Sequence, residues 1–520
     1  MALLDSSAWM RLDRILVVVL LLVVAKWTLQ YFRHRQLAKK WNTEPVKNHK
    51  LFLQTVPEIF SHRKDTALGF LLERMFSRFE KSNSDTLSLS IPASSGTLMI
   101  TMNPENMKAM LLTQFSDFSI GVRKQAFGPL LGNGIFASEG QHWKHSRTLL
   151  KPQFVREQIS HVKMLEPHVQ MLARHIHANK GYFDIQLLFH RFTLDAGTQF
   201  LFGESVNDLR DETIGFDPQE NYIEGRDEFN SALTFVQSYL IKRLALFDFY
   251  WIANNKKFRQ SVRDIHSYTD NFVNRALELK PEEIEARSRQ GYTFLYELVK
   301  DTRNPVDIRD QLLNIMLAGR STTASLLLTA MSELSRNPEV WKKLREEVLM
   351  QFGTGECPEE LDSITFESLK KCNYLKWVVN ETLRVYPPVS LNLREALKDT
   401  TLPSGGGKDG NAPIFVPKGS RVIFLIYCVQ RLKKHYGEDA DVFRPERWAD
   451  LQRIGWAFMP FGSGPRICLG QQFALTEALY VLVRLAQMFE TLEGDGSPYP
   501  AKKEANATLR YMNGVNVKMY

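Results

Sequence analysis

The chain contains few cysteines, and they form no regular pattern. Only four occur in 520 residues, Cys357, Cys372, Cys428 and Cys468, without a Cys-x-x-Cys pair or the spacing of a zinc finger. A disulfide framework is therefore not indicated, and a reducing compartment that faces the cytosol fits best. The sequence also lacks an internal repeat, a low-complexity tract and a long Gly/Ser-rich linker. Residues 41–520 are therefore predicted to form one large domain.

The basic residues lack a concentrated stripe. Lys and Arg number 66 against 58 Asp and Glu, a formal net charge of +8, but the excess is dispersed and no nucleic-acid-binding motif accompanies it. Binding of nucleic acid is therefore not predicted. A dispersed positive excess would instead help to seat the protein against anionic lipid and an acidic electron donor.

A long apolar run occurs only near the amino terminus. Ile15–Ala25 is eleven apolar residues, and aromatic residues extend it to position 32. A helix over about 15–32 would be roughly 27 Å long, close to the thickness of a bilayer core. Basic residues follow at Arg33, Arg35, Lys39 and Lys40. Residues 1–40 are therefore predicted to form a single-pass signal anchor in the endoplasmic reticulum membrane, with the large domain in the cytosol. A cleaved signal peptide is the alternative, but no small-x-small cleavage site precedes the basic cluster.

One ten-residue run, Phe461–Gly470, reads as a heme-thiolate loop. Its two inner glycines, Gly462 and Gly464, allow a tight turn close to a flat macrocycle. Cys468 offers a thiolate to iron, and Gly470 stands where a helix over 471–488 would begin against the ring. Arg466 is suited to a heme propionate, because a guanidinium pairs with a carboxylate in a bidentate manner. The alternative for a lone cysteine is an inert core residue.

The register of these residues resembles the cytochrome P-450 superfamily, whose signature is Phe-x-x-Gly-x-Arg-x-Cys-x-Gly. The resemblance implies a mainly α fold with small β-sheets, and heme b, iron protoporphyrin IX, with Cys468 as axial ligand. It further implies a monooxygenase that uses dioxygen and electrons from NADPH-cytochrome reductase, with cytochrome b5 as a second candidate donor.

Residues 306–336 are predicted to form one long helix, opened by Asn304-Pro305 and closed before Pro338. Its apolar centre is interrupted at Ala318-Gly-Arg-Ser-Thr-Thr323, where small and polar residues are expected to loosen the helical hydrogen bonds. The alternative is a threonine hydroxyl bonded to the carbonyl one turn earlier. In the superfamily this is the oxygen-activation turn, which implies a role in proton delivery for Thr322. Ser321 stands where the family has an acid, and a hydroxyl cannot relay protons as a carboxylate does.

Further residues are identified by their spacing and by the resemblance. Glu381 and Arg384 share a helical face, and the superfamily completes this pair with Arg447 as a buried structural network. Trp143 and Arg147 resemble the pair that reaches a heme propionate from one helix. Arg394, after Pro387-Pro388, resembles another propionate-binding arginine, with an ordinary surface arginine as the alternative.

The stretch from Gly134 to His168 and the run Phe461–Ala478 resemble the fungal n-alkane and fatty-acid hydroxylases. This resemblance implies hydroxylation of a long aliphatic chain at or near its end. An apolar pocket for such a substrate is compatible with the sequence. Its predicted lining consists of Phe115, Phe118, Phe127, Ile135, Phe136 and Ala318. The alternative is that these side chains simply pack on one another.

Two other functions remain open. One is a tailoring oxygenase of fungal secondary metabolism, and the other is a heme-thiolate protein that isomerises peroxides or only binds a ligand. The sequence does not identify the chain length or the carbon oxidised.

Overall fold

The computed structural model describes residues 6–90, 97–156, 161–217, 222–290, 292–451 and 454–520. The chain folds into two compact units. The first consists of Met1–Val56, Phe79–Phe118 and Arg394–Ile423, and the second of Pro57–Arg78, Ser119–Leu393 and Phe424–Tyr520.

The first unit is organised by β-structure. A six-stranded sheet has the order β1 (Asn48–Lys50), β2 (Thr86–Ser90), β3 (Thr97–Thr101), β9 (Arg421–Leu425), β6 (Leu391–Ala396) and β4 (Phe118–Ser119). Its last three strands run across the unit boundaries. Strands β2 and β3 are antiparallel, and the hydroxyl groups of Thr86 and Thr101 lie 2.9 Å apart between them. A separate hairpin pairs β7 (Thr400–Gly406) with β8 (Ala412–Val416), and the Asn106 side chain donates a hydrogen bond of 2.8 Å to the carbonyl oxygen of Ser404 in β7.

The amino-terminal helix α1 spans Ser6–Lys40 and ends at the last residue of the predicted anchor segment. Residues 1–5 of that segment lie outside the described residues. Near the end of α1, Arg33 donates a hydrogen bond of 2.8 Å to the Asp399 carboxylate. Among the residues that the structure describes, no helix combines the length and the apolar character needed to cross a bilayer.

The second unit is mainly helical, as predicted for the large domain. Its longer helices are α5 (Arg123–Leu131), α6 (Gly140–Arg156), α7 (His161–Ala178), α8 (Ile185–Phe202), α9 (Arg226–Ala245), α10 (Lys256–Glu278), α11 (Pro281–Gln290), α12 (Phe294–Asp301), α13 (Pro305–Arg336), α14 (Pro338–Phe352), α17 (Asn373–Val385) and α20 (Gln471–Met488). Four shorter ones are α15 (Pro358–Ser363), α16 (Phe366–Leu369), α18 (Ile426–Val429) and α19 (Lys433–Tyr436). Helices α2 (Phe52–Leu68) and α3 (Leu71–Ser82) run across the unit boundaries.

Two small sheets complete the second unit. One has the strand order β10 (Leu492–Gly494), β13 (Asn516–Met519) and β5 (Phe183–Asp184). The other pairs β11 (Lys503–Ala505) with β12 (Leu509–Tyr511) in antiparallel fashion.

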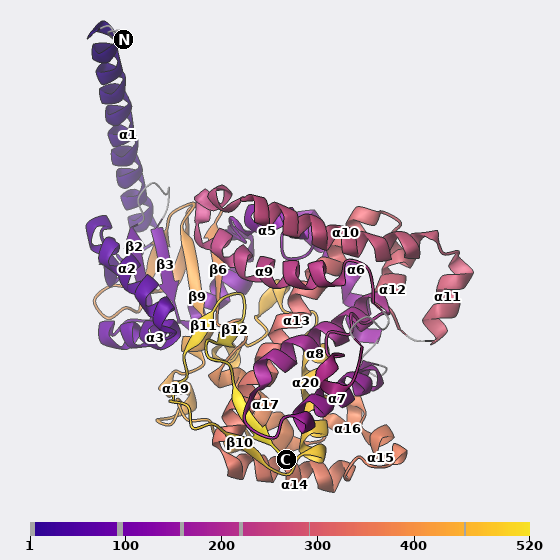
Figure 1. Cartoon of the computed structure of the whole chain (residues 1–520). Helices are drawn as coiled ribbons and strands as arrows, with labels where there is room; N and C mark the ends of the chain where they lie inside the picture. The colour runs from indigo at the N-terminus through magenta and orange to yellow at the C-terminus, as the bar shows by residue number, and fades with distance from the viewer. Residues whose placement is uncertain (1–5, 91–96, 157–160, 218–221, 291, 452–453) are drawn as a thin grey trace. The chain divides into compact units, whose positions relative to one another are not determined.

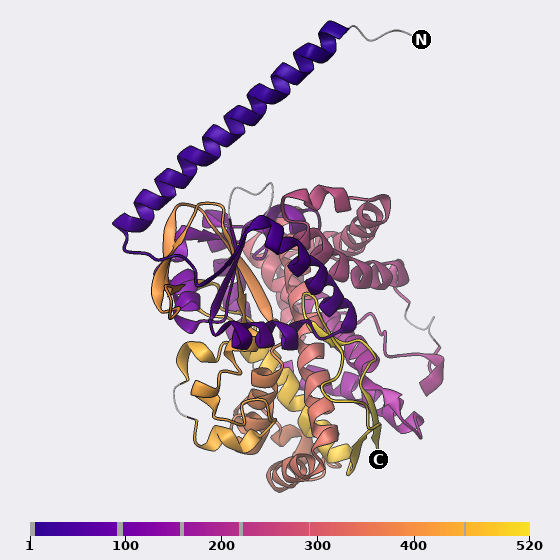
Figure 2. The ribbon, with the colours of Figure 1, turned by 90° about the vertical axis from the view of Figure 1, so that its left-hand side faces the viewer.

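Helix α13 forms the centre of the second unit, where it packs against α8, α10, α17 and α20. Figures 1 and 2 show it running through the bundle of helices. The Asn304 side chain caps its first turn by accepting hydrogen bonds from the backbone N–H groups of Val306 and Asp307, and Pro305 occupies the first helical position. The predicted helix over 306–336 is therefore confirmed.

Candidate active site

The loop before α20 is a tight turn built on two glycines. Gly462 and Gly464 have φ angles of +70° and +74°, a region that side-chain-bearing residues rarely adopt. The backbone N–H of Cys468 donates a hydrogen bond of 3.0 Å to the carbonyl oxygen of Phe461, which closes the loop. Gly470 is the N-cap of α20, and a Cβ at this position would lie 3.5 Å from the Phe154 ring.

Cys468 is an exposed residue of this loop. Residues 461–475 all retain partial solvent exposure, whereas residues 476–487 of α20 are buried. Burial of its surroundings nevertheless raises the pKa of the Cys468 thiol, while the Gly470 N–H and the charge of Arg147 oppose that rise. One face is therefore open to a flat ligand, and the two opposing groups would stabilise a thiolate there.

Two arginines frame Trp143 next to the loop. The Arg466 guanidinium lies 4.6 Å from the centre of the Trp143 ring and donates a hydrogen bond of 2.9 Å to the carbonyl oxygen of Ser138. Arg147, one turn after Trp143 on α6, lies 5.9 Å from the same ring and donates to the carbonyl oxygen of Ile467. The structure thus brings together Trp143, Arg147 and Arg466.

This region carries an excess of positive charge. Arg123 and Arg466 share a single acidic neighbour, Glu139, and Arg147 adds a third cation. Desolvation lowers the pKa of Arg123 to about 10 and that of Arg466 to about 10. Partly buried cations without enough anions are costly, so these arginines are matched to an anionic ligand. A thiol facing an open surface beside such arginines fits iron protoporphyrin IX, which carries two propionates.

Helix α13 exposes a narrow stripe near its centre, while Leu317 is partly exposed on a different face. Ile315, Ala318, Gly319 and Thr322 are partly exposed, and their spacing places them on one helical face. A Cβ added at Gly319 would meet no atom within 4 Å. The stripe therefore borders open space.

The helix itself is continuous from Pro305 to Arg336, so the expectation of loosened hydrogen bonds at 318–323 is wrong. The Thr322 hydroxyl instead donates a hydrogen bond of 2.7 Å to the carbonyl oxygen of Ala318 and so completes a regular turn.

Ser321 is buried and faces helix α9. The Gln237 side chain of α9 donates a hydrogen bond of 3.1 Å to its hydroxyl oxygen, and Arg320 contacts the other end of the same amide. Sequence reasoning missed Gln237, because nothing in the pattern of α9 indicates that its side chain meets a residue 84 positions away.

Glu381 is the centre of a fully buried ionic network. Arg384 forms two hydrogen bonds with its carboxylate, of 2.8 and 2.9 Å, and Arg447 adds a third of 2.8 Å. The Trp448 indole and the backbone N–H of Arg444 also donate to this carboxylate. The structure thus brings together the three residues of the predicted network. Every carboxylate lone pair has a donor nearby, which makes the burial of the charges tolerable.

This network is joined to the cysteine loop by Gln430. Arg384 donates to the carbonyl oxygen of Gln430, and the Gln430 side chain donates in turn to the carbonyl oxygens of Leu383 and Arg384. Its own oxygen accepts a hydrogen bond of 3.0 Å from the backbone N–H of Met459. The backbone N–H of Gly462 then bonds to the Met459 carbonyl oxygen. The position of the loop therefore depends on α17 through a short series of hydrogen bonds.

The segment 131–138 is held on α13 by two buried polar side chains. Asp310 accepts a hydrogen bond from the backbone N–H of Asn133, and Asn314 accepts one from Phe136 and donates one to the carbonyl oxygen of Leu131. A Cβ at Gly134 would overlap the Asn314 side chain. Sequence reasoning missed Asp310 and Asn314, although two polar residues one turn apart in an apolar helix were a usable signal.

The predicted pocket residues do not share one environment. Ile135 and Phe136 are half-buried, and Ala318 lies on the open stripe of α13. Phe127 is buried in the hydrophobic core, which agrees with the alternative that it packs on its neighbours. Phe115, Phe118 and Arg394 belong to the first unit, where Phe118 and Arg394 are buried.

A further acid that the sequence did not indicate lies between α13 and α20. Glu477 is buried, and desolvation raises the pKa of its carboxyl to about 8. The Thr323 hydroxyl lies near this carboxyl and opposes the shift, although it forms no fully aligned hydrogen bond with a described residue. Glu477 therefore binds a proton over much of the neutral range.

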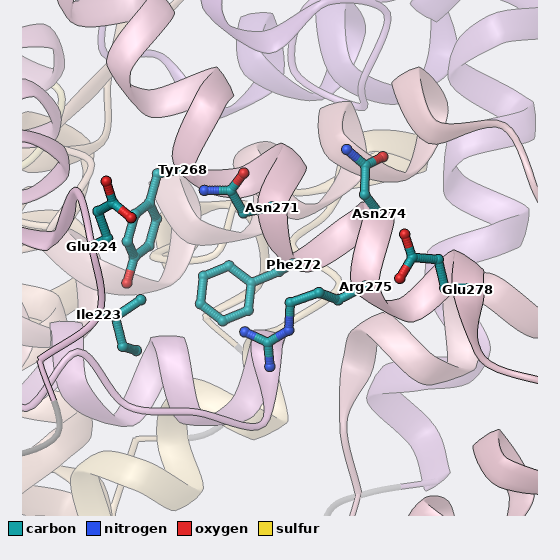
Figure 3. Close-up of a pocket in the computed structure, with 8 residues that line it drawn as sticks. All are labelled: Ile223, Glu224, Tyr268, Asn271, Phe272, Asn274, Arg275 and Glu278. Atoms are coloured by element: carbon teal, nitrogen blue, oxygen red, sulfur yellow. The ribbon is translucent and has the colours of Figure 1, made fainter.

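A surface pocket of about 410 Å³ lies elsewhere in the second unit (Figure 3). It is lined by Ile223, Glu224, Tyr268, Asn271, Phe272, Asn274, Arg275 and Glu278. Arg275 is already paired with Glu204, and Phe272 stacks on Phe202 within the core. None of the residues predicted for catalysis lines it.

Comparison with known proteins identifies one family. The family model described as Cytochrome P450 matches residues 65–517. Cytochrome P450 52A3-A of Candida maltosa is 56% identical over 421 residues, which cover 80% of each chain. Cytochrome P450 52A12 of Debaryomyces hansenii is 48% identical over 510 residues, covering 96% of this chain and 97% of the relative. Among solved structures, the cytochrome P450DA heme domain matches with a TM-score of 0.71 at 20% identity, covering 88% of this chain and 94% of that one, which shows a common fold.

Proposed function

Since this chain belongs to the cytochrome P450 family of heme-thiolate monooxygenases, we propose that it hydroxylates a long alkane or fatty acid at or near the terminal carbon. The observation that carries the proposal is the open face of the Cys468 loop beside three arginines, of which Arg123 and Arg466 share one acidic neighbour. Members of this family contain heme with an axial cysteine thiolate, take electrons from a redox partner and act on hydrophobic substrates.

Each residue of the site has a proposed task in holding the heme. Cys468 provides the axial thiolate, and the Gly470 N–H and Arg147 temper its charge. Arg466, Arg147 and Trp143 would bind the propionates, with Arg123 as a further cation. When bound, the heme supplies the reductive activation of dioxygen. Phe461, Gly462 and Gly470 shape the loop, and the network of Glu381, Arg384 and Arg447 holds it in one position.

The proposed contribution of α13 is to handle protons and substrate. Thr322 keeps its own hydrogen in the bond to Ala318, so its oxygen is available as an acceptor on the open stripe. Ser321 is a proposed donor, and Ala318 and Gly319 leave room beside the helix for small molecules. Ile135 and Phe136 provide apolar surface at the segment that docks on α13.

The proposed substrate is supported by similarity and by simple energetics. The relatives with 48–56% identity belong to one numbered P450 group, and the segment Gly134–His168 resembles alkane and fatty-acid hydroxylases. Burial of each methylene group of the substrate contributes about 0.8 kcal/mol to the free energy of binding, so an apolar surface readily provides affinity for long chains. Selection of one chain length is harder, because one methylene discriminates by only about 1–3 kcal/mol.

The proposed setting is the endoplasmic reticulum membrane, with the catalytic domain in the cytosol. The apolar run Ile15–Ala25 within α1 and the basic residues that follow support an anchor and contact with lipid. NADPH-cytochrome reductase is the proposed electron donor, and cytochrome b5 a second one.

The first experiment tests the type of reaction. Microsomes containing the chain are incubated with NADPH and reductase, or with a lipid hydroperoxide alone. We expect an aliphatic substrate to be hydroxylated when NADPH and reductase are present, and the lipid hydroperoxide not to be rearranged when it is given alone, together with the ferrous carbon monoxide band typical of a thiolate-bound heme. Rearrangement of the hydroperoxide without an electron donor would instead identify a peroxide isomerase.

A second experiment tests the substrate. A panel of alkanes, fatty acids and aromatic secondary metabolites is incubated under the same conditions and analysed by mass spectrometry. Terminal or near-terminal alcohols of the aliphatic members support the proposal. Oxidation of the aromatic members alone would favour a tailoring oxygenase.

A further inference from the structure

Two adjacent residues of α13, Arg320 and Ser321, are bridged by one side chain from α9. Neighbouring residues on a helix point about 100° apart and do not contact each other. Gln237 contacts both, because its amide has an acceptor at one end and donors at the other. Arg320 also donates a hydrogen bond of 3.1 Å to Thr234, one turn earlier on α9.

The chemistry of the partners fixes the orientation of the Gln237 amide. A guanidinium has no acceptor, so the Gln237 Oε1 atom must face Arg320, at 3.4 Å from its Nη1 atom. The amide nitrogen then faces Ser321 and donates to its oxygen at 3.1 Å. Ser321 is therefore an acceptor in this bridge, and its own hydrogen is left for a different partner.

The next hydroxyl along the helix has the opposite role. Thr322 donates its hydrogen to the carbonyl oxygen of Ala318 at 2.7 Å, so its oxygen is free to accept. Among the described residues, none accepts a hydrogen bond from Ser321 in the way that Ala318 does from Thr322. This turn of α13 therefore holds two adjacent hydroxyl groups with opposite roles. Ser321 is left as a hydrogen-bond donor, and Thr322 is left as an acceptor.

Arg320 strengthens this arrangement. Its side chain is only 8% exposed, its Nε atom has no hydrogen-bond partner among the described residues, and desolvation lowers the pKa of the guanidinium to about 10. A buried cation polarises the amide to which it donates, and a polarised amide is a better donor to the next group. In this bridge Arg320 donates to Gln237 and Gln237 donates to Ser321, so the first hydrogen bond strengthens the second.

We propose that Gln237 is a positioning residue for proton delivery, which holds the Ser321 hydroxyl as a hydrogen-bond donor where other family members have an acid. This inference rests on the proposed monooxygenase function and deepens it. It also makes the donor state of Ser321 depend on the position of α9, since Thr234 and Gln237 both lie on that helix.

The variant Gln237→Glu separates this role from a purely structural one. A glutamate of the same shape has only acceptors, so it would still pair with Arg320 but would force Ser321 to turn its hydrogen toward α9. A structural bridge between α9 and α13 would be as strong or stronger, because a salt bridge replaces a neutral contact. Proton delivery, by contrast, would lose its donor.

The test uses full-length protein in microsomes with reductase, NADPH and palmitate as the probe. For Gln237→Glu we expect the fraction of NADPH electrons that reaches hydroxylated product to fall by about threefold to tenfold, the range of one lost hydrogen bond. The remainder should be released as hydrogen peroxide. Palmitate hydroxylation supported by an added organic hydroperoxide should not change, because that oxidant already contains the reduced oxygen atoms. In this route the hydroperoxide is reduced to its alcohol as palmitate gains one oxygen atom.

Two controls complete the design. Ser321→Ala should cause a similar loss, and the double variant Ser321→Ala/Gln237→Glu should be no worse than either single variant, because both remove the same donor. Unchanged electron coupling in Gln237→Glu, or an equal fall in both routes, would overturn the inference. Failure of the wild-type chain to form the thiolate-type carbon monoxide band, or to hydroxylate palmitate with NADPH, would instead count against the proposed function.

Discussion

At the scale of single residues, Ser321 and its neighbours show how a hydroxyl is adapted to a position where an acid is expected. Its oxygen is occupied by Gln237, and the adjacent Thr322 is bonded to its own helix. The sequence alone shows that Ser321 departs from the oxygen-activation motif of the family, because a hydroxyl stands there in place of an acid. The partner that compensates for it could not, because a hydrogen bond between α9 and α13 depends on how the two helices pack.

Replacement of Ser321 by aspartate tests the same position from the opposite direction. The carboxylate would accept from the Gln237 amide and lie near Arg320, so it could be buried with partners. We expect Ser321→Asp to raise the fraction of reducing equivalents that ends in product, because a carboxylate gathers and relays protons better than a hydroxyl. Coupling is measured as product formed per NADPH consumed, with Ser325→Asp as a control on a buried part of α13 away from Gln237. No gain in coupling would contradict the account of proton delivery.

At the scale of helices and strands, the sequence was informative where local signals were strong. Asn304-Pro305 and Pro338 bracket α13, and Gly470 marks the start of α20, so both helices could be predicted closely. The docking of residues 131–138 could not be predicted, because Asp310 and Asn314 bind backbone groups about 180 positions earlier. The division of the chain into two compact units also follows from long-range contacts that no local pattern records.

The contact between Gly134 and α13 gives a prediction for stability. Gly134→Ala would force a methyl group into the Asn314 side chain, and overpacking of this kind costs about 1–3 kcal/mol. The free energy of unfolding, measured in urea on the same preparation, should fall by that amount.

Gly197→Ala in α8 is the matched control. Its Cβ would lie 3.9 Å from the Met316 sulfur, an ordinary contact, and alanine favours a helix interior by about 0.5–1 kcal/mol. Equal effects of the two substitutions would refute the docking argument.

Glu477 makes the packing of α13 on α20 sensitive to pH. Because burial raises the pKa of its carboxyl to about 8, the folded protein keeps this proton between about pH 4.5 and pH 8 while the unfolded chain has lost it. The contribution of Glu477 to stability therefore declines as the pH rises through that window, by at most about 1.4 kcal/mol per pH unit. Glutamine cannot ionise, so Glu477→Gln should become more stable relative to wild type as the pH increases.

Urea unfolding of both proteins at several pH values checks this prediction. The comparison must be a difference between the two proteins, because burial also raises the pKa values of Asp195 and Glu333 to about 7. A difference that is constant from pH 5 to pH 8 would show that Glu477 is ionised in the folded state.

At the scale of the whole molecule, the amino-terminal helix is separable from the proposed chemistry. The ion pair between Arg33 and Asp399 is largely exposed on the arginine side, and exposed pairs contribute only about 0–1 kcal/mol. Removal of residues 1–40 should therefore leave heme binding intact, as judged by the carbon monoxide band, while the protein moves from the membrane pellet to the supernatant. A truncated protein that stays in the pellet after alkaline carbonate extraction would contradict the proposed anchor.

The way in which Arg384 and Arg447 bind residues 430–442 has a consequence for evolution and engineering. Most of their contacts there are to main-chain oxygens, those of Gln430, Tyr436, Asp439, Ala440 and Val442. A main-chain oxygen is present whatever the side chain, so this segment can drift in sequence while the geometry around it is kept. Mutant libraries directed at these positions other than Gln430 and Asp439, whose side chains take part in the network, should consequently retain pigment, whereas those directed at the two arginines should yield mostly colourless protein.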